Sequence, residues 1–542
     1  MRRLSVALLL TSICGTALAA DPCDTLVIPP AVGVGSPSDI TSLNQLISES
    51  LANLEASSYL YANLLWIDQA GQIDFSRSIA RQIDVFDNGQ RYVVTMRPWP
   101  WSDGAPVTAD DVLYTWKLIQ KLGTNYVQYG QGGVPQLIAS FKVLSPEQFQ
   151  ITLTRPVNPI WFELDGLEDL VPFPRHAWGE ISADQLWQKQ NDPQFFKVAD
   201  GPYQLEEFKL GRSISFVPNQ KYPLEHSPFH RMVIKFLQNG GTELQGVQSG
   251  EVDLADLPPE AFDASKSIKN VHVVVEPGSF SYWSMGLNFK NAAAPFFKDV
   301  RVRQAIEDAI DQKSMITRLW RGYGEEAYGP VPLDPPGFLS PAARAGRFSV
   351  GYDPQKSASL LDQAGYTLGN DGIRVKNGVR LEFTVLIPSG TINELMVAQF
   401  MQPELRKLGI VMQIKLEDFN QMLATLYNGI APWQAYIIIN SLPAFPSGEG
   451  TFTTGGVDNF GKYSDPKMDD LVSASINQPG LDGLFKFEDY ASEQQPVIFL
   501  PQLNYVVLER NGISGAGNIV SPGSQYNPQL LKLDREVCNV AH

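Results

Sequence analysis

A strand–helix–strand pattern late in the chain is the feature that most constrains the fold. Residues 381–387 and 410–416 have the composition and alternation of strands, while residues 393–407 between them predict a helix. Strands that are joined through a helix pair in parallel, because a tight turn can join only antiparallel strands. The pattern therefore predicts an α/β fold.

The length and composition indicate a large globular protein. The chain has 542 residues, too many for one hydrophobic core, and implies roughly three domains or subdomains at about 150 residues each. Hydrophobic residues make up 44% and charged residues 18% of the chain, which excludes a disordered or fibrous protein. With strand and helix patterns in both halves, two α/β lobes are expected.

The first 19 residues have the pattern of a secretory signal peptide. Arg2 and Arg3 precede a short apolar run, and Ala17 and Ala19 supply the small residues of a cleavage site after about Ala19. No later stretch reaches the ~20 apolar residues of a membrane-spanning helix. We therefore expect an exported protein in the periplasm. Lipid attachment at Cys14 is the alternative, which the bulky Ile13 disfavours.

Charge and cysteine content agree with export. Removal of residues 1–19 changes the formal net charge from −16 to −18, which argues against a nucleic-acid partner. Cys23 and Cys538 are the cysteines that remain, and in an oxidising compartment they are natural disulfide partners. Two free thiols are the alternative, because sequence does not give their geometry.

A turn followed by a helix start is predicted for residues 99–116. Their sequence is Trp-Pro-Trp-Ser-Asp-Gly-Ala-Pro-Val-Thr-Ala-Asp-Asp-Val-Leu-Tyr-Thr-Trp. Residues 103–106 have turn chemistry, Thr108 is an N-cap candidate, and Asp110 and Asp111 suit the first helical turn. This string resembles a signature of the periplasmic solute-binding proteins of ABC importers, family 5, the oligopeptide/dipeptide/nickel-binding family. Residues 201–222, with Gly-Pro-Tyr, and residues 288–311 resemble the same family, so the resemblance covers nearly the whole mature chain.

The resemblance implies a two-lobed periplasmic binding protein fold (type II, cluster C) with an extra subdomain in the first lobe. Mapped onto this chain, it predicts a signal peptide (1–19), a lobe I first segment (20–57), a lobe I inserted subdomain (58–181), a lobe I middle segment (182–279), lobe II (280–500) and a lobe I C-terminal segment (501–542). The chain is expected to cross between the lobes near residues 277–281 and 499–502.

Familiar enzyme motifs are absent from the sequence. It contains no His-Glu-x-x-His of a zinc peptidase and no Gly-x-Ser-x-Gly of a hydrolase. His226 and His230 have helical spacing, but Pro228 between them disfavours a shared helix face and hence a metal site. We therefore expect no enzyme activity, no metal and no cofactor.

Two glycine patterns match nucleotide-binding motifs only in part. Residues 456–462 have the glycine and lysine spacing of a phosphate-binding loop, but Tyr463 replaces the Ser or Thr that would contact magnesium, and no strand precedes them. Gly322 and Gly324 match part of a dinucleotide pattern, yet they follow a predicted helix instead of a strand. Both matches are interpreted as chance.

Aromatic residues are numerous, with 28 Phe, 19 Tyr and 10 Trp, and such residues fill cores as well as solute pockets. The resemblance implies that the strand with Tyr282 and Trp283 faces the ligand. Because neighbours in a strand point to opposite faces, at most one of the two should contact a solute. Further candidate ligand-binding residues are Tyr126, Tyr129, Phe419, Asn440, Ser441, Leu442 and Tyr505.

The region around Asn440 indicates the kind of solute. Peptide-binding members of the family have a Gly-Trp here, followed by an Asp that holds the peptide amino terminus. In this chain the pair is Asn440-Ser441, and Ala444 stands near the place of that Asp. Residues 387–391 also lack the Arg that holds a ligand carboxylate in dipeptide-type members. A buried charge without its partner is costly, so we expect an uncharged, amphiphilic or blocked peptide-like solute and not a zwitterionic dipeptide. Alternatively, Asn440 only caps a strand end.

Together, these features predict a monomeric receptor that closes two lobes around a small-molecule solute and presents the closed form to ABC importer permease subunits. Two alternatives stay open at this point. One is a secreted hydrolase that uses paired carboxylates and needs no histidine. The other is a periplasmic scaffold or chaperone that kept the fold without importer coupling.

Overall fold

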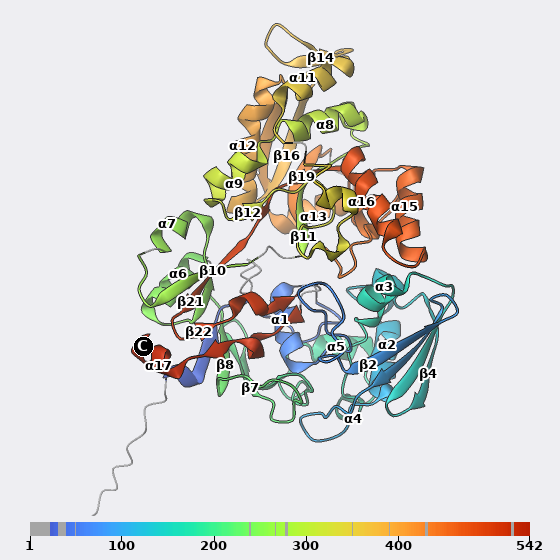
Figure 1. The fold of residues 1–542 in the computed structure, drawn as a ribbon, viewed down its shortest axis with the longest axis vertical. Coiled ribbons are helices and arrows are strands. Elements are labelled where there is room, and N and C mark those ends of the chain that lie inside the picture. The colour runs from blue at the N-terminus through green and yellow to red at the C-terminus, as the bar shows by residue number, and fades with distance from the viewer. Residues whose placement is uncertain are drawn as a thin grey trace, which may run out of the picture.

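Two lobes make up the molecule, and they lie one above the other in Figure 1. The structure, a computed structural model, describes residues 22–30, 40–48, 50–237, 240–265, 267–276, 280–349, 351–389, 391–428, 432–521 and 525–541. The upper lobe extends from β11 (Ser281–Leu287) to β19 (Val497–Leu500), and the lower lobe contains the segments before and after it. The predicted signal peptide with Cys14, and residues 277–279 of the first predicted crossing, lie outside the described residues.

A five-stranded sheet with the order β17-β16-β18-β11-β19 forms the centre of the upper lobe. β16 (Glu382–Pro388) and β17 (Val411–Glu417) pair in parallel and are joined by α12 (Ile392–Lys407), so the predicted strand–helix–strand unit is confirmed to within a residue or two. β18 (Ala435–Ser441) is parallel to β16, whereas β11 is antiparallel to both β18 and β19. Every residue of β11 is buried, because this strand lies inside the sheet with both faces covered.

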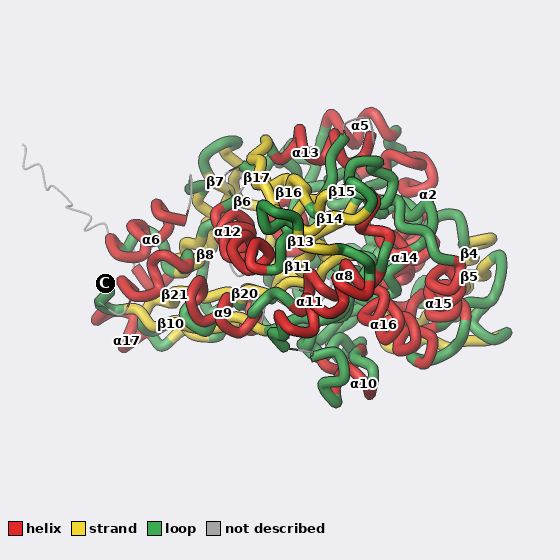
Figure 2. Tube along the Cα trace, turned by 90° about the horizontal axis from the view of Figure 1, so that it is seen from above, coloured by secondary structure: helices red, strands yellow, loops and turns green. Residues whose placement is uncertain are grey.

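Helices surround this sheet on both faces (Figure 2). Those of the upper lobe are α8 (Val300–Asp308), α9 (Gln312–Trp320), α10 (Pro341–Arg344), α11 (Pro354–Gln363), α13 (Phe419–Asn428), α14 (Glu449–Phe452), α15 (Pro466–Asn477) and α16 (Asp482–Gln494). A small outer sheet contains β13 (Thr367–Leu368), β14 (Arg374–Lys376) and β15 (Val379–Arg380). In α8 the predicted apolar face, with Val302, Ala305 and Ile306, is buried.

Two sheets form the base of the lower lobe. The first has the order β1-β8-β7-β6, from β1 (Thr25–Ile28), β8 (Arg231–Lys235), β7 (Ser213–Pro218) and β6 (Tyr203–Lys209). The second has the order β10-β21-β9, from β10 (Val271–Glu276), β21 (Tyr505–Arg510) and β9 (Leu254–Asp256). The remaining elements here are α1 (Leu51–Leu60), α6 (Gly240–Ser249), α7 (Phe262–Ser265), α17 (Arg535–Ala541), β22 (Ile513–Ser514), β23 (Val520–Ser521), β24 (Gln525–Tyr526) and β25 (Lys532–Leu533).

A separate antiparallel sheet lies at the other end of the lower lobe, far from α17 in both Figure 1 and Figure 2. It has the order β2-β3-β5-β4, from β2 (Ala80–Phe86), β3 (Arg91–Met96), β5 (Gln148–Leu153) and β4 (Ile138–Ser145). The helices near it are α2 (Ala109–Leu122), α3 (Pro159–Trp161), α4 (Arg175–Trp178) and α5 (Ala183–Gln188). The helix start predicted at Thr108 is confirmed, since its N–H donates to Asp111 Oδ2 over 2.8 Å.

The chain changes lobes twice. It passes from β10 in the lower lobe to β11 in the upper lobe, and it returns from β19 to β21. On the return path, β20 (Gln502–Leu503) pairs with β12 (Gly324–Glu325) of the upper lobe. Cys23 and Cys538, both buried, form a disulfide with a Cα–Cα distance of 6.1 Å, which joins α17 to the residues before β1. Within the described ranges, no helix has the length and apolar character needed to span a membrane.

Candidate functional site

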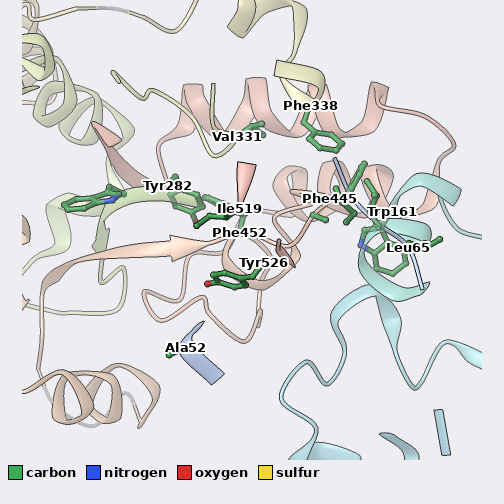
Figure 3. Close-up of a cluster of buried hydrophobic side chains, with 14 of the residues drawn as sticks. Ala52, Leu65, Trp161, Tyr282, Val331, Phe338, Phe445, Phe452, Ile519 and Tyr526 are labelled. Carbon is green, nitrogen blue, oxygen red and sulfur yellow. The ribbon is translucent and has the colours of Figure 1, made fainter. Parts of the chain in front are cut away.

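Buried side chains from both lobes meet where the lobes face each other, and we call this contact region the interlobe seam (Figure 3). The buried cluster in Figure 3 includes Ala52, Leu65, Trp161, Ile519 and Tyr526 of the lower lobe, and Tyr282, Val331, Phe338, Phe445 and Phe452 of the upper lobe. The rings of Phe338 and Phe445 lie 5.9 Å apart between centroids. A Cβ added to Gly71 of the lower lobe would stand 2.7 Å from Phe338 Cε2, so the lobes are in close contact there.

Asn158 makes the densest set of polar contacts across the interlobe seam. This side chain is fully buried, and its Nδ2 donates to the carbonyl oxygens of Ser475 and Gly480, both over 2.8 Å. Its main-chain N–H donates to the Ile476 carbonyl over 2.7 Å. Asn158 also caps α3, because its Oδ1 accepts from the Ile160 N–H over 3.2 Å. One side chain therefore fixes a lower-lobe helix start against the end of α15.

Asp165 supplies a carboxylate to the same region. It lies in a π-helical turn, Phe162–Leu167, and its Oδ1 accepts from the Phe445 N–H of the upper lobe over 2.7 Å. The side chain is 1% exposed, and its Oδ2 has no hydrogen-bond partner among the described residues. Burial raises the pKa of Asp165 well above its usual range, although the Phe445 N–H acts in the opposite direction.

Other carboxyl groups of the lower lobe gather near Asp165. Glu168 Oε1 accepts from Asn63 Nδ2 over 3.0 Å and from Gln525 Nε2 over 2.8 Å. Desolvation raises the pKa of Glu168 to about 7, and it raises the pKa of the adjacent Asp169 well above the usual range. In the described part of the chain, none of Asp165, Glu168 and Asp169 forms an ion pair. Burial therefore favours the protonated forms of these carboxyl groups.

A crevice of about 510 Å3 lies between the two lobes beside these residues. The lower lobe lines it with Gly133, Arg155 and Trp161, and the upper lobe lines it with Glu449, Thr453 and Asp469. Burial raises the pKa of Glu449 to about 7. Trp161 is 2% exposed, and its indole N–H has no acceptor within the described residues. The lower wall of the crevice thus includes a tryptophan whose buried N–H is unpartnered in the described structure, and Asp165 lies four residues further along the chain.

Tyr282 and Trp283 point to opposite faces of the central sheet, as the alternation of a strand requires. The Tyr282 ring packs on Phe452 and Phe499, with centroid distances of 6.1 and 5.8 Å, and belongs to the cluster in Figure 3. The Trp283 ring packs on Trp320 at 5.7 Å. Of the two residues, Tyr282 therefore lies on the side of the interlobe seam.

Asn440, Ser441 and Leu442 lie at the end of β18, opposite the start of β11. Asn440 is the pairing partner of Tyr282, and its Nδ2 donates to Ser284 Oγ over 2.9 Å. Ser441 is exposed, and Leu442 is half-buried with its N–H bonded to the Phe280 carbonyl over 3.0 Å. Asn440 thus has a structural hydrogen bond, as the strand-end alternative requires, and its part in solute binding stays a prediction.

The remaining predicted residues have different surroundings. Tyr126 is buried, and its hydroxyl donates to Gln128 Oε1 over 3.0 Å. Tyr129 and Phe419 are exposed by 40% and 46%, and Tyr505 is half-buried at the start of β21. Their roles in solute binding also stay predictions.

Sequence reasoning missed Asn158, Trp161 and Asp165. The Asn-Pro pair at 158–159 is the signal that indicates Asn158, because Asn before Pro is a common helix start. No sequence pattern indicates the π-helical turn with Asp165, but such turns are frequent at functional sites. No cluster of three or more His, Cys, Asp or Glu residues suited to a metal ion occurs among the residues that the structure describes.

The two-lobed α/β fold with a crevice between the lobes defines the class of periplasmic solute-binding proteins. NikA from Brucella suis, solved in complex with Fe(III)-EDTA, has the same fold, with a TM-score of 0.77 and 19% identity over 94% of this chain and all of that chain. Residues 74–455 match the family model of bacterial extracellular solute-binding proteins, family 5, middle region. The chain therefore belongs to this family.

Curated relatives match over most of their length. The oligopeptide-binding protein AppA of Bacillus subtilis is 24% identical over 478 residues, which cover 86% of this chain and 85% of AppA. The probable D,D-dipeptide-binding periplasmic protein DdpA of Escherichia coli is also 24% identical, over 97% of this chain and 96% of DdpA. The similarity thus extends well beyond the residues that the family model matches.

Proposed function

We propose that this protein is an exported receptor that binds a small solute between its lobes and delivers it to an ABC importer. The observation that supports this most directly is the interlobe crevice, which residues of both lobes line, among them Trp161, whose N–H has no partner in the described structure. Buried polar atoms without partners are unfavourable, and a solute that pairs with them offsets this cost. A solute that contacts both lobes also stabilises the closed arrangement relative to an open one.

The names of the relatives support a small solute but differ in its chemistry. AppA is named for oligopeptides, DdpA for D,D-dipeptides, and NikA was solved with a metal chelate. We propose an uncharged, amphiphilic or blocked peptide-like solute for this chain. The raised pKa of Glu449, which lines the crevice, supports this choice, because a protonated carboxyl group bonds to amides and hydroxyls without requiring a cation.

Export, cleavage after about Ala19, a monomeric state and coupling to permease subunits belong to the same proposal. The N-terminal apolar segment supports export. A disulfide between Cys23 and Cys538 suits an oxidising compartment outside the cytoplasm.

Native mass spectrometry of the mature protein, purified without denaturation, is the first test. We expect a stoichiometric small molecule that dissociates on activation and whose mass identifies it. Titration with this compound should then reduce the radius of gyration of solute-stripped protein in X-ray scattering. If no solute of any class binds the stripped protein in a calorimetric screen of peptides, sugars and amphiphiles, the receptor proposal is wrong.

Two matched tryptophan variants test the place of binding. Trp161→Phe removes the unused N–H at the crevice and should weaken solute binding by on the order of tenfold, the loss of one hydrogen bond to a buried donor. Trp116→Phe is the control, because its N–H also has no partner in the described structure but its ring packs on Phe141, away from the crevice. Equal affinities of both variants and the wild type would place the solute elsewhere.

The two alternatives predict different results. A hydrolase that uses paired carboxylates would convert the bound compound, so its mass would change with time while a receptor returns it intact. A scaffold or chaperone would bind unfolded protein and would not compact on adding a small molecule. The family membership favours the receptor, since these relatives are binding proteins.

A further inference from the structure

A second cavity lies in the upper lobe, at the end of β11 that is remote from the lobe crossing. Its volume is about 470 Å3, and Phe289, two residues beyond β11, forms part of its wall. The side chains that determine its charge are Lys290, Lys298, Arg303, Lys462 and Asp465. We call this cavity the basic pocket.

The basic pocket has four cations and one carboxylate, in a chain whose formal net charge is −16. Lys290, Lys298 and Lys462 are exposed, and none of them forms an ion pair with a described residue. Like charges that gather without counter-charges repel one another, so an unpaired cluster favours an anion from outside.

Asp465 does not neutralise these lysines through direct contact, because its oxygens already have partners. Oδ2 accepts from the hydroxyls of Tyr463 and Tyr490 over 3.1 and 2.8 Å, and Oδ1 accepts from the Lys467 N–H over 2.9 Å. These bonds outweigh desolvation and keep the pKa of Asp465 below its usual value. Asp465 therefore caps α15 and forms no ion pair with the three lysines of the basic pocket in the described structure.

Arg303 is a buried cation that forms no ion pair with a carboxylate among the described residues. It is 3% exposed, and its guanidinium donates to three main-chain carbonyls, those of Phe297, Gln494 and Gln495, over 2.6 to 3.0 Å. A guanidinium has five N–H groups, so one N–H on each terminal nitrogen is left for another acceptor. Desolvation lowers the pKa of Arg303 to about 10, which still leaves it charged at neutral pH.

The backbone holds Lys462 in a fixed place. A Cβ on Gly461 would stand 2.0 Å from the Leu287 carbonyl oxygen, so only glycine permits this close approach to β11. Asn459 Nδ2 donates to the carbonyls of Thr453 and Tyr463, both over 2.8 Å, and its Oδ1 accepts from the Tyr463 N–H over 2.9 Å. The loop that presents Lys462 is thus ordered before any ligand arrives.

This loop contains the partial glycine–lysine match at residues 456–462. It is not a phosphate-binding loop of the nucleotide-binding kind, because the short helix α14 precedes it instead of a strand. Lys462 nevertheless lines the basic pocket together with Ser464. The lysine of this loop therefore adds to the positive charge of the cavity.

We propose that the basic pocket binds a multiply charged anion with phosphate groups, independently of the interlobe crevice. Phosphate oxygens accept several charge-assisted hydrogen bonds at once, which suits three lysines and a guanidinium around one concave site. Two sources share this chemistry, a soluble phosphate compound and the headgroup of an anionic phospholipid.

Calorimetry with inorganic pyrophosphate at low ionic strength tests the proposal. We expect a dissociation constant below about 1 mM for the wild-type protein. The double variant Lys298→Glu/Lys462→Glu should bind at least about tenfold more weakly, because two attractive charges become repulsive. Lys486→Glu is the control, since Lys486 is an exposed residue of α16 that does not line the pocket, and it should change the affinity less than about twofold. Circular dichroism verifies that each variant is folded.

A flotation assay separates the two sources. Vesicles of phosphatidylglycerol are compared with vesicles of phosphatidylcholine, for the wild type and the double variant. Binding of pyrophosphate alone indicates a soluble ligand, and binding of phosphatidylglycerol vesicles alone, lost in the double variant, indicates a lipid headgroup. The proposal is wrong if the wild type binds neither probe, or if the double variant and the Lys486→Glu control bind as the wild type does.

Discussion

The interlobe seam and the basic pocket differ in the charge and the burial of their ionisable groups. Asp165, Glu168 and Asp169 are acids without ion-pair partners in the described structure, and burial raises their pKa values. In the basic pocket the lysines are exposed to water, and the buried cation, Arg303, is bonded to carbonyl oxygens.

The difference follows from what each ion can do when solvent is removed. A carboxylate can take up a proton near neutral pH at a modest cost in free energy, so several carboxyl groups can be buried next to one another in the protonated form. Arginine cannot lose its proton in this range, so its burial requires several acceptors that are fixed in place. Closure of the lobes should therefore respond to pH, whereas the basic pocket should respond to salt and anions.

The largest effect is expected at Asn158, which makes the most polar contacts in the interlobe seam. Asn158→Ala leaves the carbonyls of Ser475 and Gly480 and the Ile160 N–H without this partner and should lower the free energy of unfolding by about 3 kcal/mol. Urea denaturation measures this loss. Asp470→Ala, an exposed change on the same helix, should cost less than about 0.5 kcal/mol. Equal losses would mean that Asn158 does not hold the lobes.

A pH effect of intermediate size is expected from Glu168. Its folded-state pKa of about 7 lies above the ordinary value of 4.5, so the stability it contributes is present below 4.5 and is lost as the pH rises through 7. Glu168→Gln keeps an oxygen acceptor for Asn63 and Gln525, and it should remove about 2 kcal/mol of the decrease in unfolding free energy between pH 5 and pH 8. An unchanged pH profile would show that Glu168 ionises freely.

A smaller effect of the same sign is expected at Asp165. Asp165→Asn keeps the acceptor for the Phe445 N–H but cannot ionise, so it should stabilise the protein at pH 8 and change the stability little at pH 3, below the ordinary Asp pKa of 3.8. Asp165→Ala loses the acceptor and should destabilise the protein at pH 3. Equal stabilisation by Asp165→Asn at pH 3 and pH 8 would contradict the raised pKa.

The smallest effect is expected in the basic pocket. Lys298→Gln/Lys462→Gln removes two exposed charges that repel their neighbours, and the unfolding free energy should change by less than about 0.5 kcal/mol, with a slight gain at low salt. Denaturation in 10 mM and 500 mM sodium chloride measures the difference. A large loss would mean that these lysines stabilise the fold.

Local elements of the fold were predictable because nearby residues determine them. The strand–helix–strand unit and the helix start at Thr108 depend on periodicity and on contacts three residues apart, such as Thr108 to Asp111. The hairpin of β6 and β7 is another local element, since its turn depends on Gly211 and glycine permits the positive φ of 70° found there. The family resemblance then supplied the two-lobed arrangement.

The interlobe seam could not be predicted in the same way. Asp165 and Phe445 are 280 residues apart, and Asn158 and Ser475 are 317 apart, so no local pattern links them. The basic pocket could not be predicted for the same reason, because its cations come from three separate segments of the upper lobe that only the fold brings together. Only the packed structure shows which of the many acids lack a counter-ion and which lysines lie close together.

The disulfide between Cys23 and Cys538 has a consequence for the timing of maturation. These cysteines are separated by 515 residues, so the bond cannot form until nearly the entire chain has been synthesised and has folded far enough to bring its two ends together. The thiol of Cys23 consequently stays available to alkylating reagents during earlier stages and becomes inaccessible at the last one. The loss of Cys23 labelling over time would therefore report when folding and disulfide formation of this protein are complete.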